Sequence, residues 1–347
     1  MPWKGWLAFL ALWSAGVHAA PYAAPLWLPG GDLQTIYTSV FIASPAVDYR
    51  RERLELDDGD FLDFDWVDGA ENSPLVILFH GLEGNSSSFY ARDLMDAVKQ
   101  RGWNGVVAHF RGCSGEDNRL PRVYFAGDSK EIELILRHVK AQHPAQPLYA
   151  VGVSLGGNAL LKWLGEKGDA AAELVTRAAA VSAPLDLTAT GNALDFGFNR
   201  YVYTSRFLVT LKAKALRKAE KFPGLLDTDA ISAATTFREF DTLVTARLQG
   251  YKDAADYWEK VSSKPWLKFI KIPTLVLNAK NDPFLPASAL PTTSEVSDTV
   301  TLEQPDSGGH VAFPEGPFPG NAGWLPQHLI TFLTSGSNDP ALTSSSK

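Results

Sequence analysis

The chain has 347 residues, with 32 lysines and arginines against 39 aspartates and glutamates, and its formal net charge is −7 at pH 7. This acidic balance argues against a nucleic-acid partner, because proteins that bind nucleic acids usually present a basic face. Hydrophobic residues make up 45% of the chain, which is enough to bury a large core and excludes a disordered protein. The length allows one large domain or two ordinary ones.

The chain offers little with which to bind a metal or to close a disulfide. Cys113 is its only cysteine, so neither an intrachain disulfide nor a cysteine-based zinc site can form. The seven histidines are scattered and contain no His-Glu-x-x-His pattern or comparable cluster. The sequence therefore argues against a metal enzyme.

Residues 1–20 are typical of a secretory signal peptide or another N-terminal extension. A lysine supplies positive charge, residues 5–17 form an apolar run, and Val17 and Ala19 suit positions −3 and −1 of a cleavage site. The run is shorter than the roughly 20 residues that a membrane-spanning helix needs. Cleavage would make the protein exported or periplasmic, whereas an uncleaved extension or a misassigned start would leave it cytoplasmic. Residues 335–347 are small and polar and predict a flexible tail.

From residue 50 onward, strand patterns alternate with helix patterns. The expected strands cover 53–56, 61–67, 75–79, 105–110, 148–153, 178–182, 274–278 and 300–302, and the expected helices cover about 88–100, 132–139, 159–164 and 327–333. The first two strands flank an Asp-Asp-Gly-Asp turn and predict a hairpin. The later alternation predicts βαβ units, and hence a mostly parallel central sheet covered by helices on both faces.

The alternation breaks at about residues 184–270. This stretch is rich in lysine, arginine, threonine and aromatic residues and has no clear buried strand. It predicts a helical insertion within one domain of residues 21–334, because no internal repeat or low-complexity linker divides the chain.

Residues 152–156 (GVSLG) match G-x-S-x-G, the pattern of a nucleophile elbow. The pattern alone is weak, but here it lies between an apolar strand and a helix, where the motif's mechanics require it. The glycines leave room for a strained turn that pushes the Ser154 hydroxyl out of the sheet. The alternative is a glycine-rich turn with an incidental serine.

A serine nucleophile needs a histidine base and a carboxylate to orient that base. Only His310 and His328 follow Ser154, and His310 lies in a Ser-Gly-Gly-His loop, whereas His328 falls in the expected terminal helix. Asp282 follows the penultimate strand and precedes His310, which gives the chain order Ser, Asp, His. Asp306 is the rival acid, but it is too near the histidine to come from a separate strand end.

An oxyanion hole needs two backbone N–H groups near the serine. One is expected from Leu155, directly after the nucleophile, and the other from Leu82 in the loop that follows the strand at 75–79 (HGLEG, residues 80–84). His80 in that loop is interpreted as a residue that shapes the loop, since His310 already supplies the base.

Together these motifs resemble the YheT-like esterases, a bacterial branch of the α/β-hydrolase superfamily related to a eukaryotic group of membrane-associated lipid hydrolases. The resemblance covers about residues 21–334 and is carried by 27–35 (WLPGGDLQT), 80–84 (HGLEG), 109–115 (HFRGCSG), 152–158 (GVSLGGN), 240–245 (FDTLVT), 279–286 (AKNDPFLP) and 308–313 (GGHVAF). The chain departs from the family at Asp32, where His or Asn is expected, and in its N-terminal extension, since bacterial members usually look cytosolic.

The resemblance implies an α/β-hydrolase fold and a serine carboxylesterase with Ser154, Asp282 and His310 as its triad. Such an esterase needs no cofactor and no metal. It also implies that the insertion is a helical cap over the acyl site. Aromatic residues at the front of the insertion either line an acyl pocket or pack between cap and sheet; they are Phe196, Phe198, Tyr201, Tyr203 and Phe207. Arg111 and Cys113 are expected to pack within their loop.

The expected substrate is a small-molecule or lipid-like ester with an apolar acyl group of short to medium length, and a membrane surface is a candidate transient partner. An acyltransferase or a thioesterase would use the same triad, so both stay open. A hydrolase fold that binds a lipid or a partner protein without catalysis is the alternative from another class. The oligomeric state stays open.

Overall fold

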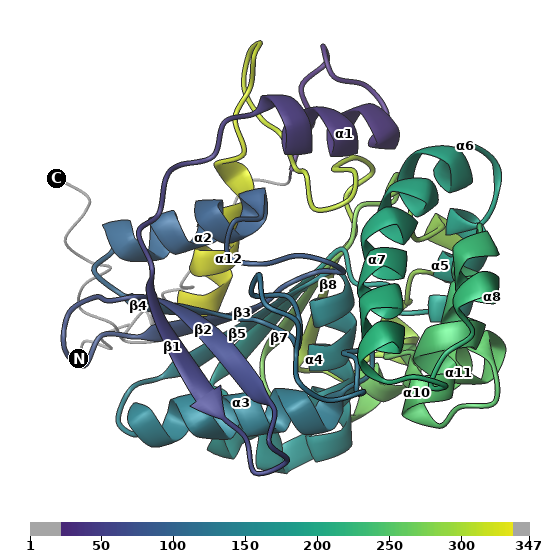
Figure 1. The fold of residues 1–347 in the computed structure, drawn as a ribbon. Helices are drawn as coiled ribbons and strands as arrows, with labels where there is room; N and C mark the ends of the chain where they lie inside the picture. Colours follow the sequence, from purple (N-terminus) through teal and green to yellow (C-terminus); the bar gives the residue numbers. More distant parts are fainter. Residues whose placement is uncertain (1–21, 336–347) are drawn as a thin grey trace, which may run out of the picture.

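The computed structural model describes residues 22–335 (Figure 1). The predicted signal peptide at 1–20 and residues 336–347 of the predicted tail lie outside the described residues.

Eight strands form one sheet in the order β1-β2-β4-β3-β5-β6-β7-β8. The strands are β1 (Arg50–Glu55), β2 (Phe61–Val67), β3 (Leu75–Phe79), β4 (Asn104–Ala108), β5 (Leu148–Val153), β6 (Arg177–Val181), β7 (Thr274–Leu277) and β8 (Val300–Glu303). The β1–β2 and β2–β4 pairs are antiparallel and the other pairs are parallel. The predicted mostly parallel sheet and its leading hairpin are confirmed. The carboxyl ends of the parallel strands therefore share one edge.

Helices cover both faces of the sheet (Figure 1). On one face, α2 (Phe89–Gln100) and α12 (Trp324–Thr334) bury their apolar side chains against alternate residues of the strands. On the other face, α3 (Ser129–Gln142) and α4 (Leu155–Lys167) bury theirs. Because both faces are covered, β3, β4, β5 and β7 consist of buried residues throughout, as expected of parallel strands.

The strand expected at 105–110 ends two residues early, at Ala108. His109 and Phe110 leave the sheet because their polar groups find partners in neighbouring loops and strands. The Phe110 N–H donates to His80 Nε2 at 3.1 Å, and the His109 ring bonds to Asp65.

Only helices lie between β6 and β7, which pair directly with each other. They are α5 (Leu187–Leu194), α6 (Gly197–Asn199), η2 (Arg200–Thr204), α7 (Ser205–Lys221), α8 (Thr228–Ala233), α9 (Phe237–Phe240), η3 (Asp241–Ala246), α10 (Arg247–Gln249), α11 (Ala254–Val261) and η4 (Lys264–Phe269). Two of these, η2 and η3, are π-helices. Figure 1 shows α5 to α11 gathered beside the sheet. We keep the name helical insertion for residues 184–270.

The remaining helices are shorter or lie at the start of the described chain. They are α1 (Gly31–Phe41), η1 (Gly168–Glu173), η5 (Ala287–Ala289) and η6 (Thr293–Glu295). Figure 1 shows α1 beside loops of the C-terminal part of the chain. Between residues 22 and 335, no helix combines the length and the apolar character that a bilayer crossing requires.

Candidate active site

Ser154 stands at the turn between β5 and α4, with φ +50° and ψ −119°. Its strained backbone is held because two glycines let neighbouring chain segments come very close. A Cβ on Gly152 would lie 2.6 Å from Gly157 Cα, and a Cβ on Gly156 would lie 2.4 Å from the Phe79 carbonyl oxygen. The Ser154 N–H donates to the Val181 carbonyl at 2.8 Å, which ties the turn to the next strand. This is the strand–turn–helix geometry that the motif predicts.

Ser154, His310 and Asp282 come together although they are 156 and 28 residues apart in the chain. His310 Nε2 lies 3.0 Å from Ser154 Oγ, and His310 Nδ1 lies 2.8 Å from Asp282 Oδ2. The Asp282 side chain is 1% exposed and that of His310 is 11% exposed. The buried carboxylate therefore faces one ring nitrogen, and the partly accessible hydroxyl faces the other.

The second oxygen of Asp282 is also engaged. Oδ1 accepts a hydrogen bond from the Phe284 N–H at 2.8 Å. The Phe284 ring stacks on the His310 ring, with centroids 4.0 Å apart and planes 30° apart. The loop after β7 thus orients both the carboxylate and the imidazole.

The two rival residues lie elsewhere. Asp306 is exposed and forms an ion pair with Lys280. His328 lies on α12, where it bonds to Glu303 and stacks on Trp324. The structure therefore brings neither rival into contact with Ser154.

The loop that carries His310 is held by α1, at the opposite end of the chain. Thr35 Oγ1 accepts from the His310 N–H at 2.8 Å and donates to the Gly31 carbonyl at 2.7 Å. Gln34 Oε1 accepts from the Gly308 N–H at 2.9 Å and from Asn281 Nδ2 at 3.0 Å. Sequence reasoning missed these positioning residues. The signal was present, because Gln34, Thr35 and Asn281 all fall within the family motifs.

Replacing Thr35 by valine is expected to lower kcat for ester hydrolysis by about 10- to 100-fold, because the buried His310 N–H loses its acceptor and the imidazole shifts. Steady-state kinetics on a p-nitrophenyl ester measure this effect. Thr38→Val is the matched control on the same helix, because the buried Thr38 Oγ1 has no hydrogen-bond partner among the described residues. Equal losses in both variants would contradict the positioning role of Thr35.

The loop with Leu82 runs directly against the serine. A Cβ on Gly81 would lie 3.2 Å from Ser154 Cβ, so a larger residue here would crowd the serine. Leu82 and Leu155 both line the pocket that contains Ser154 and His310. Within residues 22–335, no group accepts a hydrogen bond from the N–H of Leu82 or of Leu155. Both donors therefore remain available to a ligand.

His80 joins two loops and is held neutral. Its Nε2 accepts from the Phe110 N–H at 3.1 Å, so the ring proton lies on Nδ1, which donates to the Gly81 carbonyl at 2.8 Å. Complete burial lowers the pKa of His80 to about 3. Both ring nitrogens are thus used to shape the loops.

Arg111 and Cys113 pack within the loop after β4, as expected. The buried Arg111 guanidinium binds Glu131 at 2.6 Å, Asp58 at 2.8 Å and Asp60 at 3.0 Å. Burial raises the pKa of the Cys113 thiol to about 12, so this group is not a ready nucleophile at neutral pH.

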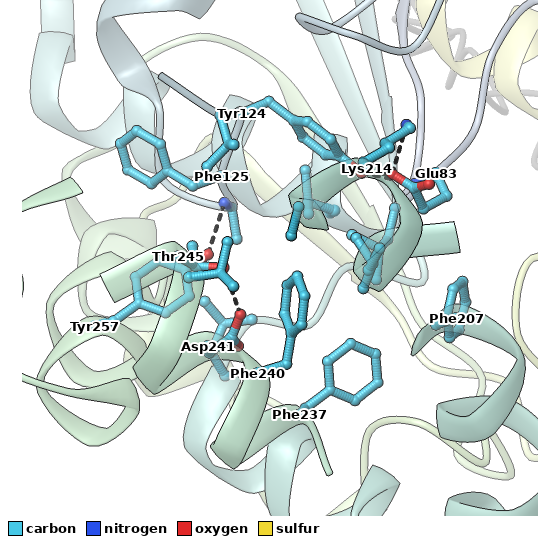
Figure 2. Close-up of a pocket in the computed structure, with 18 of the residues that line it drawn as sticks. Glu83, Tyr124, Phe125, Phe207, Lys214, Phe237, Phe240, Asp241, Thr245 and Tyr257 are labelled. Atoms are coloured by element: carbon cyan, nitrogen blue, oxygen red, sulfur yellow. Dashed lines mark hydrogen bonds and ion pairs between the residues drawn. The ribbon is translucent and has the colours of Figure 1, made fainter. Parts of the chain in front are cut away.

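The pocket beside Ser154 extends beneath the helical insertion, and its wall is mostly apolar, with several aromatic side chains (Figure 2). The aromatic lining residues are Tyr124, Phe125, Phe207, Phe237, Phe240, Tyr257, Trp258 and Phe284. Of the aromatic residues at 196–207, Phe207 lines this pocket and Tyr203 is buried in the core, so each meets one of the two expected alternatives. The expectation is wrong for Phe196, Phe198 and Tyr201, which are 81%, 55% and 77% exposed and form neither a pocket wall nor a core.

Tyr203 is buried and holds the helical insertion against α1. Its hydroxyl donates to Asp32 Oδ1 at 2.8 Å. Asp32 is the residue at which the sequence departs from the family motif, and this hydrogen bond gives it a structural role. The link joins η2 to the helix that supports the His310 loop.

Asp241 is a buried carboxyl group in the pocket wall (Figure 2). Its two oxygens accept from Thr245 Oγ1 and from Trp258 Nε1, each at 2.7 Å. Burial raises the pKa of Asp241 to about 6, and the nearby Asp195 acts in the same direction. Folding therefore favours the protonated form of this group.

The Asp241→Asn variant is expected to gain stability relative to wild type as the pH rises. In wild type, the unfolded carboxyl ionises near pH 4 whereas the folded one holds its proton to about pH 6. Wild type therefore loses stability between pH 4 and 6, on the order of 3 kcal/mol, and stays at the lower value above this range. Asparagine does not titrate and can keep both contacts, with its oxygen accepting from Trp258 Nε1 and its NH₂ donating to Thr245 Oγ1. Thermal unfolding of both proteins from pH 4 to 8 measures the difference, and a pH-independent difference would contradict this assignment.

Comparison with known proteins identifies the family to which this chain belongs. A family model described as the alpha/beta hydrolase fold matches residues 74–317. This chain belongs to the α/β-hydrolase family. The strand order, the turn at Ser154 and the position of His310 after the last strand agree with that membership.

Among curated relatives, this α/β hydrolase is 39% identical to "Putative esterase YheT" of Escherichia coli over 308 residues, which cover 87% of this chain and 90% of the relative. The predicted YheT-like resemblance is confirmed. It is also 30% identical to "Phospholipase ABHD3" of Homo sapiens over 321 residues, which cover 90% of this chain and 78% of the relative.

Solved structures agree on the fold alone. The esterase Pf2001 of Pyrococcus furiosus aligns with a TM-score of 0.53 at 15% identity and covers 85% of this chain and 98% of its own. A lipase described from Acinetobacter baumannii aligns with a TM-score of 0.53 at 16% identity and covers 86% of this chain and 93% of its own. The chain is thus an α/β hydrolase whose curated relatives are named as an esterase and as phospholipases.

Proposed function

We propose that this α/β hydrolase is a serine carboxylesterase in which Ser154 is the nucleophile, His310 the general base and Asp282 the residue that orients the base. The observation that carries the proposal is the continuous hydrogen-bonded chain from Ser154 Oγ through the His310 ring to Asp282. This arrangement activates a hydroxyl group because the imidazole can accept its proton as the oxygen attacks.

In the first step, Ser154 Oγ attacks the ester carbonyl carbon while His310 Nε2 takes the hydroxyl proton. The N–H groups of Leu82 and Leu155 donate to the oxyanion. The tetrahedral intermediate expels the alcohol, which receives the proton from His310, and leaves an acyl-enzyme. Water then attacks the acyl carbon with His310 again as base, and the carboxylic acid departs. No step calls for a metal or an organic cofactor.

We further propose that residues 21–334 form one catalytic domain and that the helical insertion is a cap over the acyl site. The aromatic pocket beneath the helical insertion supports this, because it opens onto Ser154 and His310. An apolar wall favours esters with apolar acyl groups of short to medium length. The relatives named as phospholipases support a lipid-like ester, and such a substrate would bring the protein to a membrane surface transiently.

The experiment that tests the proposal is hydrolysis of p-nitrophenyl esters from acetyl to palmitoyl, together with labelling by a serine-reactive phosphonate. We expect turnover with an optimum at short to medium chain length, and a single phosphonate adduct on Ser154 located by mass spectrometry. Added acceptor alcohols separate hydrolysis from acyl transfer, since a transferase would yield the new ester. A folded protein with neither turnover nor labelling would overturn the proposal in favour of a binding protein.

A further inference from the structure

The loop that follows β3 carries an acidic side chain, Glu83, directly after Leu82. Glu83 has φ +56°, a left-handed conformation that a residue with a side chain rarely adopts. Its N–H donates to the Tyr124 hydroxyl at 2.9 Å, and the Tyr124 hydroxyl donates to Glu83 Oε1 at 2.7 Å. The tyrosine thus bridges the backbone and side chain of one residue and fixes its conformation.

The positive charge that completes this cluster comes from the helical insertion. Lys214 on α7 donates from Nζ to Glu83 Oε1 at 2.8 Å (Figure 2). The Glu83 side chain is 9% exposed, so its carboxylate depends on this partner. Lys214 Nζ also lies 3.6 Å from Cys113 Sγ and 5.9 Å from the centroid of the Tyr124 ring.

We propose that Lys214 is a positioning residue, which sets the Leu82 N–H for the oxyanion through its ion pair with Glu83. This inference rests on the proposed function. When α7 lies against the core loops, Lys214 holds Glu83, and the peptide next to Leu82 is fixed. When α7 moves away, Glu83 keeps only Tyr124. Packing of the helical insertion against the core loops is thereby coupled to positioning of the Leu82 N–H in the oxyanion hole.

A second ion pair on the same helix shows why Lys214 is distinctive. Arg217 pairs with Asp117 at 2.6 Å, and their side chains are 50% and 46% exposed. This pair also ties α7 to a core loop and carries the same positive charge on the same helix. Asp117, however, lies in the loop after β4, away from Leu82 in the chain. Comparing the two pairs therefore distinguishes the positioning of the Leu82 N–H from the general effects of a positive charge and of anchoring α7.

The test compares Lys214→Met with Arg217→Met in ester hydrolysis. We expect Lys214→Met to lower kcat by about 10- to 100-fold with little change in KM, since removing a complete oxyanion donor costs about 10²- to 10³-fold. Arg217→Met is expected to change kcat by less than about 3-fold. Lys214→Arg keeps the charge and should recover part of the loss. Equal kinetics in the two methionine variants would overturn the inference.

A second readout follows the oxyanion itself. An alkyl boronic acid adds to Ser154 Oγ and places a tetrahedral oxygen at the oxyanion position, whereas the alkanoate product needs no such adduct. Lys214→Met should weaken boronate binding by the factor seen in kcat/KM and leave alkanoate binding unchanged. Equal weakening of both ligands would indicate a role in general binding and overturn the inference.

Glu83→Gln is the second variant: it removes the negative charge of the ion pair, while its Oε1 can still accept from Tyr124. Combined with Lys214→Met, it should add little further loss, because each substitution by itself removes the ion pair. Additive losses would overturn the inference, and so would a Glu83→Gln protein with full activity. Failure of the proposed function would look different: wild type itself would show neither hydrolysis nor phosphonate labelling.

Discussion

Replacing Ser154 by alanine is expected to lower kcat/KM for p-nitrophenyl esters by about 10⁴-fold or more, because the acyl-enzyme can no longer form. The fold should persist, since the Ser154 side chain forms no helix-capping hydrogen bond and, within residues 22–335, bonds only to His310. Any remaining rate would come from the oxyanion donors and substrate binding alone.

The measurement is steady-state hydrolysis at the preferred chain length, with thermal unfolding as a check on folding. Ser129→Ala is the matched control, because Ser129 Oγ is buried and has no partner among the described residues. A Ser154→Ala protein that keeps full activity would remove Ser154 from the mechanism, whatever its distance to His310.

Asp282→Asn is expected to lower kcat by about 10⁴-fold through the tautomer of His310. The Phe284 N–H donates to Oδ1, so the oxygen of an introduced asparagine stays at that position and its NH₂ faces His310 Nδ1. An NH₂ group donates, which forces Nδ1 to accept and moves the ring proton to Nε2. Nε2 then cannot accept the proton of Ser154.

Asp306→Asn is the matched control for this substitution. Asp306 is the rival acid of the same loop region, but its side chain is 88% exposed and pairs with Lys280. Its replacement should leave kcat within about 2-fold of wild type, as expected for an exposed ion pair. Loss of activity in Asp306→Asn with retention in Asp282→Asn would reverse the assignment of the acid.

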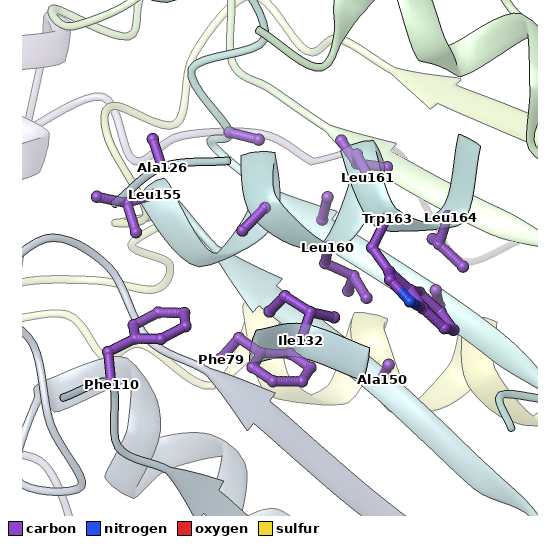
Figure 3. Packing of buried hydrophobic residues seen from close by; sticks show 14 of the residues in the cluster. Phe79, Phe110, Ala126, Ile132, Ala150, Leu155, Leu160, Leu161, Trp163 and Leu164 are labelled. Carbon is purple, nitrogen blue, oxygen red and sulfur yellow. The ribbon is translucent and has the colours of Figure 1, made fainter. Parts of the chain in front are cut away.

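The fold could be predicted because its core follows local patterns. On α3, the 3.6-residue period is followed by Ile132, Ile135, Leu136 and Val139, and all four are buried. Figure 3 shows Ile132 facing Leu160 of α4, with Phe79 of β3 beside them. Buried runs such as Leu148–Val153 gave the strands, because a parallel strand covered on both faces has no polar alternation to obscure it.

The candidate site could be predicted only for residues whose order in the chain, and whose positions after strands, follow the pattern of a known motif. The order of Ser154, Asp282 and His310 and their places after strands are readable in one dimension. The supports at Gln34 and Thr35 were not, because they act through side chain to backbone hydrogen bonds across more than 270 residues. No periodicity or spacing records such pairings.

The prediction for the aromatic residues of the helical insertion was partly wrong for another reason. Tyr201 and Tyr203 are two residues apart on η2, a spacing that places side chains on nearly opposite faces of a helix. Tyr201 is exposed while Tyr203 is buried, so closeness in the sequence did not tell which aromatic residues face the interior. Asp241 begins the second π-helix and was likewise not assigned a place.

The distance along the chain between α1 and the His310 loop also determines how long after α1 the loop is synthesised. Gln34 and Thr35 are among the first described residues to leave a ribosome, and their partners at Gly308 and His310 follow 274 and 275 residues later. At about 5–20 residues per second, this separation corresponds to roughly 15 to 60 seconds of translation. A nascent chain can bury much of its sheet during that interval, but its histidine loop has yet to be made. The proposed triad can therefore be completed only after this interval.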